Sequence, residues 1–111
     1  MVDRFKVSIL LDYYGCLLTA KQLDIMTMYF NEDLSLAEIA EINQTSRQAI
    51  HDLTKRCYKQ LVSYEEKLKL LQKSNIRKKL KEDLIDKLNV YSIEEEPKVL
   101  INETLEEILN A

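Results

Sequence analysis

Residues 35–53 read SLAEIAEINQTSRQAIHDL, and this stretch decides the fold. Ser35 followed three residues later by Glu38 is the pattern of a capping box, so a short helix is expected to begin here. Ser46 is suited to cap a second helix after a polar interruption. Two helices that cross steeply need a small residue at their contact, and Ala40 is that residue. The stretch therefore predicts a helix-turn-helix motif, with an ordinary helical hairpin as the alternative.

The contacts that would hold the two helices together are apolar and regularly spaced. The step from Ala40 to Ile50 is ten residues, which is the spacing of this motif. Its turn needs a left-handed backbone conformation, which glycine adopts most readily. Asn43 and Gln44 stand there instead. Because asparagine accepts that conformation better than most residues, we expect the turn at Asn43 or shifted by one residue. The locking contacts are expected from Ile39, Ile50 and Leu53.

Composition and periodicity predict an all-α fold. The chain has one Gly and one Pro in 111 residues, although β-hairpins and tight turns depend on these residues. Apolar residues recur every three or four positions along most of the chain. Thr19 with Gln22 is a second capping box, and Gly15 is expected to end the first helix. Besides the short helix of the motif, the expected helices span residues 3–14, 19–30, 46–73, 76–89 and 99–110.

The helix expected at residues 46–73 is too long for a small domain to cover. At a rise of about 1.5 Å per residue it would extend ~42 Å. We therefore expect its outer half to pack against the C-terminal segments or a second copy of the chain, which predicts a homodimer. The expected domains are residues 1–74 and an acidic helical extension at residues 75–111. The expected dimer interface is Leu61, Tyr64, Leu68 and Leu71.

The distribution of charge is more informative than the net charge of −3. Residues 1–44 hold three basic and seven acidic side chains, a balance of −4. Residues 45–81 hold eleven basic and three acidic, a balance of +8. Residues 82–111 hold two basic and nine acidic, a balance of −7. A basic block between acidic flanks indicates a surface that binds a polyanion.

The second helix of such a motif enters a groove of the nucleic acid with its first residues leading. Arg47 suits guanine or a phosphate, and Gln48 suits adenine. Asp52 repels phosphate, so it opposes tight duplex binding unless it turns away or orients Arg56. The candidate nucleic-acid contacts are Ser46, Arg47, Gln48, His51, Lys55, Arg56 and Lys59.

Several classes of function find no support in these residues. A chain with one Gly lacks a glycine-rich phosphate loop, and its single histidine, His51, lies in the expected recognition helix, so we expect no enzyme. Cys16 and Cys57 are too far apart for a zinc site, and we expect two buried thiols and neither metal nor cofactor. No apolar run approaches ~20 residues, and no signal peptide is recognisable, so we expect a cytoplasmic protein without membrane insertion.

The run TSRQAIHDLTKRCYKQLVSYEEKLKL at residues 45–70, preceded by LTAKQLDIMTMYFNEDLSLAEIAE at residues 18–41, closely resembles the YlxM family of small bacterial proteins. The resemblance covers roughly residues 3–75, and the SRQA-x-x-D and YEEKL elements are its most specific parts. It implies a fold similar to the promoter-binding fourth region of sigma factors. Members of that family are typically encoded beside components of the signal recognition particle, which implies a role in that pathway or in its regulation.

Three functions remain open at this point. The first is DNA-binding regulation, in which a dimer would place two recognition helices about one helical turn apart. The second is a non-catalytic module of the signal recognition particle that binds its RNA or its GTPase. The third is an interaction protein in which the acidic residues 82–111 cover the basic block.

Overall fold

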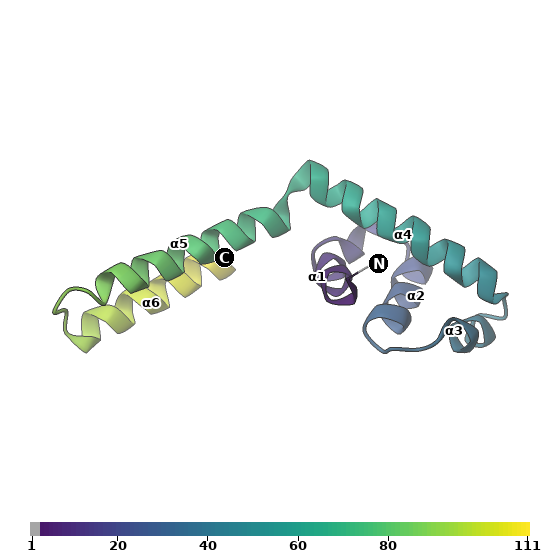
Figure 1. The fold of residues 1–111 in the computed structure, drawn as a ribbon, viewed down its shortest axis with the longest axis horizontal. Coiled ribbons are helices and arrows are strands. Elements are labelled where there is room, and N and C mark those ends of the chain that lie inside the picture. The colour runs from purple at the N-terminus through teal and green to yellow at the C-terminus, as the bar shows by residue number, and fades with distance from the viewer. Residues whose placement is uncertain (1–2) are drawn as a thin grey trace. The chain divides into compact units, whose positions relative to one another are not determined.

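The computed structural model describes residues 3–111, and helices form most of that part (Figure 1). No strand occurs among these residues, which confirms the all-α class. The chain divides into two compact units, Met1–Lys69 and Leu70–Ala111, which we call unit 1 and unit 2. In chain order the elements are α1 (Arg4–Tyr14), the 3₁₀ turn η1 (Gly15–Leu17), α2 (Ala20–Phe30), α3 (Leu36–Ile42), α4 (Arg47–Leu68), α5 (Leu70–Leu88) and α6 (Glu95–Asn110).

The helices of the motif and of α2 begin where their capping side chains predict. Thr19 and Ser35 each accept a hydrogen bond from the backbone N–H three residues on. Gln22 and Glu38 accept in return, so both capping boxes are complete. Ser46 caps α4 by accepting from a backbone N–H at 3.0 Å. The hydrogen bonds from the Ser35 backbone and hydroxyl lower the pKa of the Glu38 carboxyl below its usual value.

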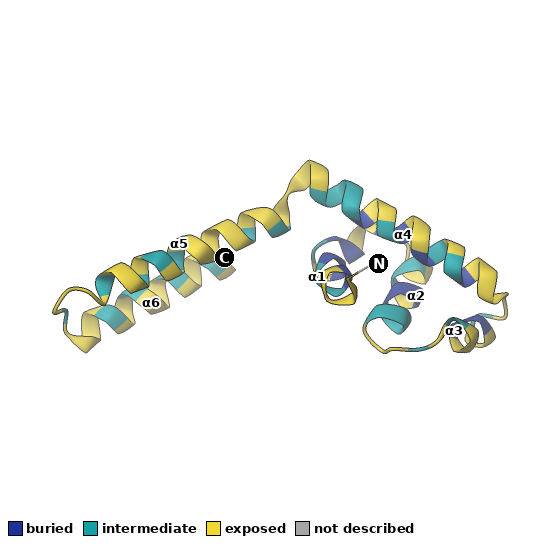
Figure 2. Ribbon diagram, in the orientation of Figure 1, coloured by how far each residue is buried: buried dark blue, intermediate teal, exposed yellow. Residues whose placement is uncertain are grey.

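In unit 1, α1, α2 and α3 lie along the same side of α4 (Figure 1). The Tyr14 hydroxyl of α1 donates to Glu65 Oε1 at 2.5 Å, which ties α1 to the C-terminal half of α4. Buried residues gather between these helices (Figure 2). The buried apolar residues are Val7, Leu10, Leu11, Tyr14, Leu18, Ile25, Met26, Ile39, Ala40, Ile50, Cys57 and Leu61.

Gly15 directly follows α1, as expected, but it provides space rather than a left-handed stop. Its φ is −57°, which is right-handed. A Cβ atom here would lie 2.9 Å from Leu23 Cδ1, the flexible end of a side chain of α2, so Leu23 would have to shift its rotamer to make room. Positive φ occurs instead at residues that have side chains: Asp33 (56°), Gln44 (53°) and Lys69 (56°).

The long helix ends earlier than its periodicity predicts. α4 stops at Leu68, and Lys69 takes the left-handed conformation with φ 56° and ψ 32°. The Lys69 N–H donates to the Glu65 carbonyl at 2.8 Å, which closes the last turn. The expected continuation of this helix to residue 73 is therefore wrong, and the division between the two compact units falls between Lys69 and Leu70. Spacings of three or four residues continue through this joint, so the pattern contains no signal for it.

Unit 2 is a hairpin of α5 and α6, which pack on each other. Lys81 of α5 forms an ion pair with Glu106 of α6. None of the residues described in unit 2 is buried in this chain (Figure 2). α6 begins at Glu95, before the predicted start at residue 99, because Pro97 lies in the first turn, where no intrahelical N–H bond is needed.

Candidate nucleic-acid interface

The helix-turn-helix consists of α3, residues 43–46 and α4. Ile25, Ile39, Ala40 and Ile50 form one buried cluster, so α3 and α4 approach each other at Ala40 as predicted. Leu53 packs partly buried against the same cluster. The small side chain of Ala40 lets the two backbones come close, and the branched neighbours fix the second helix on the first.

The turn uses the second of its two candidate residues. Gln44 is left-handed with φ 53°, whereas Asn43 has φ −95°. The Asn43 side chain instead donates from Nδ2 to the Ile39 carbonyl at 2.8 Å and so closes the end of α3. The Thr45 N–H donates to the Ala40 carbonyl at 3.0 Å. These bonds satisfy backbone groups that the end of α3 leaves open.

The first turn of α4 is exposed. Ser46, Arg47 and Gln48 all lie at the surface, while Ile50 is 1% exposed. Gln48 Nε2 donates to Asp52 Oδ1 at 2.9 Å, so Asp52 orients Gln48. We call Ser46, Arg47 and Gln48 the leading turn.

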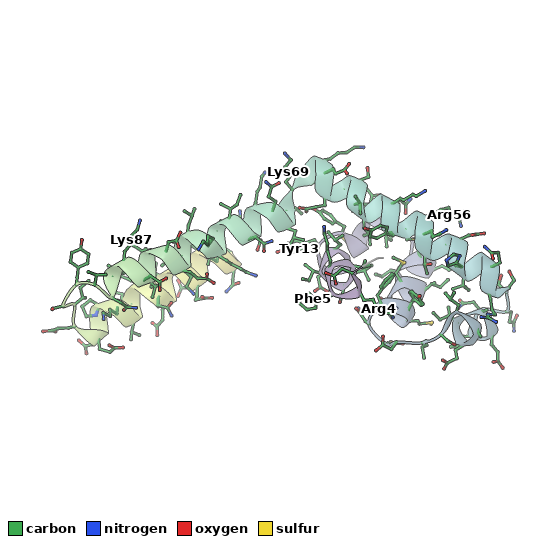
Figure 3. The ribbon with its side chains drawn as sticks, in the orientation of Figure 1. Arg4, Phe5, Tyr13, Arg56, Lys69 and Lys87 are labelled. Carbon is green, nitrogen blue, oxygen red and sulfur yellow. The ribbon has the colours of Figure 1, made fainter. Side chains whose placement is uncertain are left out.

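The other candidate contacts separate into two groups. Lys55, Arg56 and Lys59 are exposed, and within residues 3–111 none of them forms an ion pair with a carboxylate. His51 is half-buried, and with Lys55 and Lys59 it lines a cavity of unit 1. Arg56 projects from α4 away from α1 and α2 (Figure 3). The basic side chains therefore flank α4 on more than one side.

Leu61 is not available for a dimer interface, contrary to expectation. It is 0% exposed within a single chain, in the part of α4 that α1 covers. Tyr64 is half-buried and its ring lies 6.1 Å from that of Tyr14. The expectation treated the outer half of the long helix as uncovered. The structure corrects it, because α1 packs there.

The remaining two expected interface residues lie at and beyond the end of α4. Leu68 is 46% exposed. Leu71 is half-buried and belongs to α5 in unit 2. The four residues therefore do not form one continuous stripe on one helix.

An aromatic cluster at α1 and α2 was not anticipated from the sequence. The Arg4 guanidinium lies 4.6 Å from the ring centre of Tyr29 and 5.4 Å from that of Phe30. Arg4 also donates to the Tyr29 carbonyl and pairs with Asp33 at 3.1 Å. Tyr58 of α4 lines the same cavity as these side chains. Arg4 and Tyr29 are 25 residues apart, so no local pattern signals their contact.

The two cysteines differ in environment. Cys57 is buried as predicted, and burial raises the pKa of its thiol, while the charge of Arg56 acts in the opposite direction. Cys16 is exposed, so the expectation of two buried thiols was half wrong. Among the residues described, no three His, Cys, Asp or Glu side chains gather in an arrangement that could hold a metal. Within that part of the chain, no helix has the length and apolar character needed to cross a bilayer.

A short helix, a tight turn and a longer helix with an exposed leading turn define a helix-turn-helix protein. The chain belongs to the UPF0122 family, described as "Putative helix-turn-helix protein, YlxM / p13 like", which its residues 1–101 match. A UPF0122 protein of Clostridium perfringens is 62% identical over the whole of both chains. One from Clostridium botulinum is 51% identical over 97% of this chain and all of its own. Another, from Clostridium acetobutylicum, is 45% identical over all of this chain and 97% of its own. A helix-turn-helix family is not a class of enzymes.

Proposed function

We propose that the protein is a non-enzymatic, cytoplasmic nucleic-acid-binding regulator whose α4 enters the groove of a DNA duplex. The observation that carries this is a contrast within one turn of α4. Arg47 and Gln48 are exposed, whereas Ile50 is buried and anchors the helix on α3. A recognition helix needs an inner face that is anchored on the protein and leading side chains that are accessible to the nucleic acid.

Electrostatics favour an anionic partner at the same end of α4. The N-terminus of a long helix carries partial positive charge and free N–H groups, which attract phosphate. Lys55, Arg56 and Lys59 add exposed positive charge without an ion-pair partner among the described residues. Asp52 accepts a hydrogen bond from Gln48, so this carboxylate positions a base-reading amide.

The pathway in which the protein acts is proposed from its family. The YlxM family resemblance implies genes placed beside components of the signal recognition particle. We therefore propose that the protein acts in or regulates that pathway. Its RNA or protein components are the competing partners, because the same basic side chains would also hold an RNA backbone.

Binding to duplex DNA and to structured particle RNA at matched salt tests this proposal. Fluorescence anisotropy with labelled genomic duplexes and with the particle RNA gives both affinities. We expect tighter binding to a subset of duplexes than to the RNA. In titrations between ~50 and ~200 mM salt, the logarithm of the association constant should fall with the logarithm of the salt concentration, with a slope of about −0.9 per phosphate contact. Tighter binding to the RNA would contradict the DNA-binding proposal and favour a module of the signal recognition particle. Equal, weak binding to both would contradict a nucleic-acid function and favour a protein partner.

We also propose that the chain forms a homodimer through unit 2. Ile76, Leu80 and Leu84 follow one another at intervals of four on α5, and they are 51%, 63% and 39% exposed. They form an apolar stripe along one face of a helix. A two-helix unit with no buried residue is too small to be stable without further packing. α5 carries six basic and three acidic residues and α6 one basic and five acidic, so two antiparallel hairpins would complement each other.

Glutamates at Leu80 and Leu84 should convert this dimer into a monomer. Light scattering during gel filtration measures the mass of L80E/L84E and of the wild type. Phe5→Glu is the control, because Phe5 is 75% exposed in unit 1 and should leave the mass unchanged. A wild type that is monomeric at all concentrations, or a double variant that stays dimeric, would refute the proposed interface.

A further inference from the structure

Unit 1 contains a cavity of about 530 Å³ between α1, α2 and α4. This volume falls in the range of about 300–1,000 Å³ that is typical of small-molecule sites. Nothing in the proposed groove binding uses the cavity as a whole. From α4 it is lined by His51, Thr54, Lys55, Tyr58 and Lys59.

The walls on the α1 and α2 side are aromatic, and their side chains contact one another. The rings of Tyr29 and Phe30 meet edge to face, with centres 4.9 Å apart and planes at 87°. The planar guanidinium of Arg4 lies over both rings. Tyr58 supplies a third half-buried ring from α4. Such surfaces suit a flat, π-rich ligand, because rings and guanidinium planes stack on it.

The charge of the cavity is positive on the α4 side. Lys55 and Lys59 are one helical turn apart, so their ammonium groups can reach one anion together. Among the residues described, the lining of the cavity includes no Asp or Glu. Arg4 is different, because its charge is already compensated by Asp33. The positive charge of the cavity that is open to a ligand is therefore that of Lys55 and Lys59.

We propose that this cavity binds a nucleotide, with the base against Tyr29, Phe30 and Tyr58 and the phosphate between Lys55 and Lys59. An aliphatic anion would leave the aromatic walls unused, and an uncharged aromatic molecule would leave the two lysines unused. The nucleotide is either free in solution or a single unstacked residue of a nucleic-acid strand. Both sources present the same chemistry, and neither requires the leading turn of α4.

Nucleotide binding is measured by ¹H–¹⁵N NMR titration of the full-length protein with AMP, adenosine and inorganic phosphate. We expect AMP to shift the backbone signals of Tyr29, Phe30 and Tyr58, and to bind about tenfold tighter than adenosine because its phosphate makes charge-assisted bonds. K55A/K59A should reduce AMP binding to the level of adenosine. K73A/K87A removes two exposed lysines of unit 2 and should bind AMP like the wild type.

The aromatic wall separates this proposal from groove binding. F30L keeps an apolar side chain but loses the ring, and should weaken AMP binding about tenfold. Because Phe30 lies outside the leading turn and is uncharged, F30L should bind duplex DNA like the wild type. If the wild-type protein binds AMP but does not bind duplex DNA, the proposed function is refuted and the nucleotide site is retained.

The source of the nucleotide is distinguished with an RNA hairpin that carries one bulged 2-aminopurine and with its fully paired counterpart. Quenching of 2-aminopurine fluorescence that is lost in F30L identifies a strand residue as the ligand. AMP binding without such quenching identifies a free nucleotide. The proposal is overturned if neither AMP nor the bulged hairpin shifts the three aromatic signals. It is also overturned if inorganic phosphate binds as tightly as AMP, or if K55A/K59A binds AMP unchanged.

Discussion

Replacing Leu61 with alanine is expected to lower the free energy of unfolding of unit 1 by about 2–5 kcal/mol. Leu61 is 0% exposed, and α1 covers this part of α4 through the Tyr14–Tyr64 ring contact and the Tyr14–Glu65 hydrogen bond. Truncation would leave a cavity in a core that spans few helices, so the surroundings can relax only in part. Urea unfolding, followed by the near-ultraviolet signal of the buried tyrosine, measures the loss for unit 1.

Leu68→Ala is the matched control for Leu61→Ala. It removes the same atoms from the same helix two turns later, where the side chain is 46% exposed. We expect a loss below about 1 kcal/mol, because partly exposed positions lose little on truncation. Equal losses at both positions would contradict the burial described above. A Leu61→Ala variant that becomes monomeric without losing stability would restore Leu61 to a dimer interface.

Replacing Arg47 and Gln48 together with alanine should abolish sequence-specific binding to duplex DNA and leave the fold intact. Each lost base contact is worth about 1–3 kcal/mol of discrimination, so the double variant should bind its site at least about tenfold more weakly. Both side chains are exposed, and the α4 cap depends on Ser46 instead. Anisotropy titrations at fixed salt measure the affinity, and circular dichroism measures helicity.

The salt dependence of the single variant Arg47→Ala separates base contacts from phosphate contacts. If Arg47 grips only a phosphate, Arg47→Ala should weaken binding to all sequences alike and lower the salt slope by about one. Lys87→Ala in α5 removes one exposed charge from unit 2 and is expected to change neither quantity. Unchanged affinity in the double variant would mean that α4 does not enter a groove by its leading turn. Loss of helicity would mean that these side chains support the fold.

The features that the sequence predicted correctly are local ones. The capping side chains Thr19, Ser35 and Ser46 act within three residues of themselves, so their hydrogen bonds can be inferred from spacing alone. Ala40 and Ile50 were identified in the same way, because the motif fixes the distance between them along the chain. Exposure of Arg47 and Gln48 follows once the buried face of α4 is known.

The features that were missed depend on contacts between distant segments. α1 and α4 meet through Tyr14 and Glu65, which are 51 residues apart, so the burial of Leu61 had no local signature. The cavity was missed for the same reason, because Arg4 and Tyr29 come together only in the folded chain. The end of α4 at Lys69 was missed because its leucine spacing continues across the joint.

The placement of Gly15 also bears on the denatured ensemble. The chain's single glycine adopts a right-handed conformation that other residues also adopt, whereas Asp33, Gln44 and Lys69 adopt positive φ with their side chains in place. Glycine at those three sites would relieve local strain but would loosen the unfolded polypeptide, which samples more backbone states at glycine than at any other residue. A stiff unfolded chain has less entropy to lose on folding, and this gain partly offsets the strain at Asp33, Gln44 and Lys69 in the native molecule.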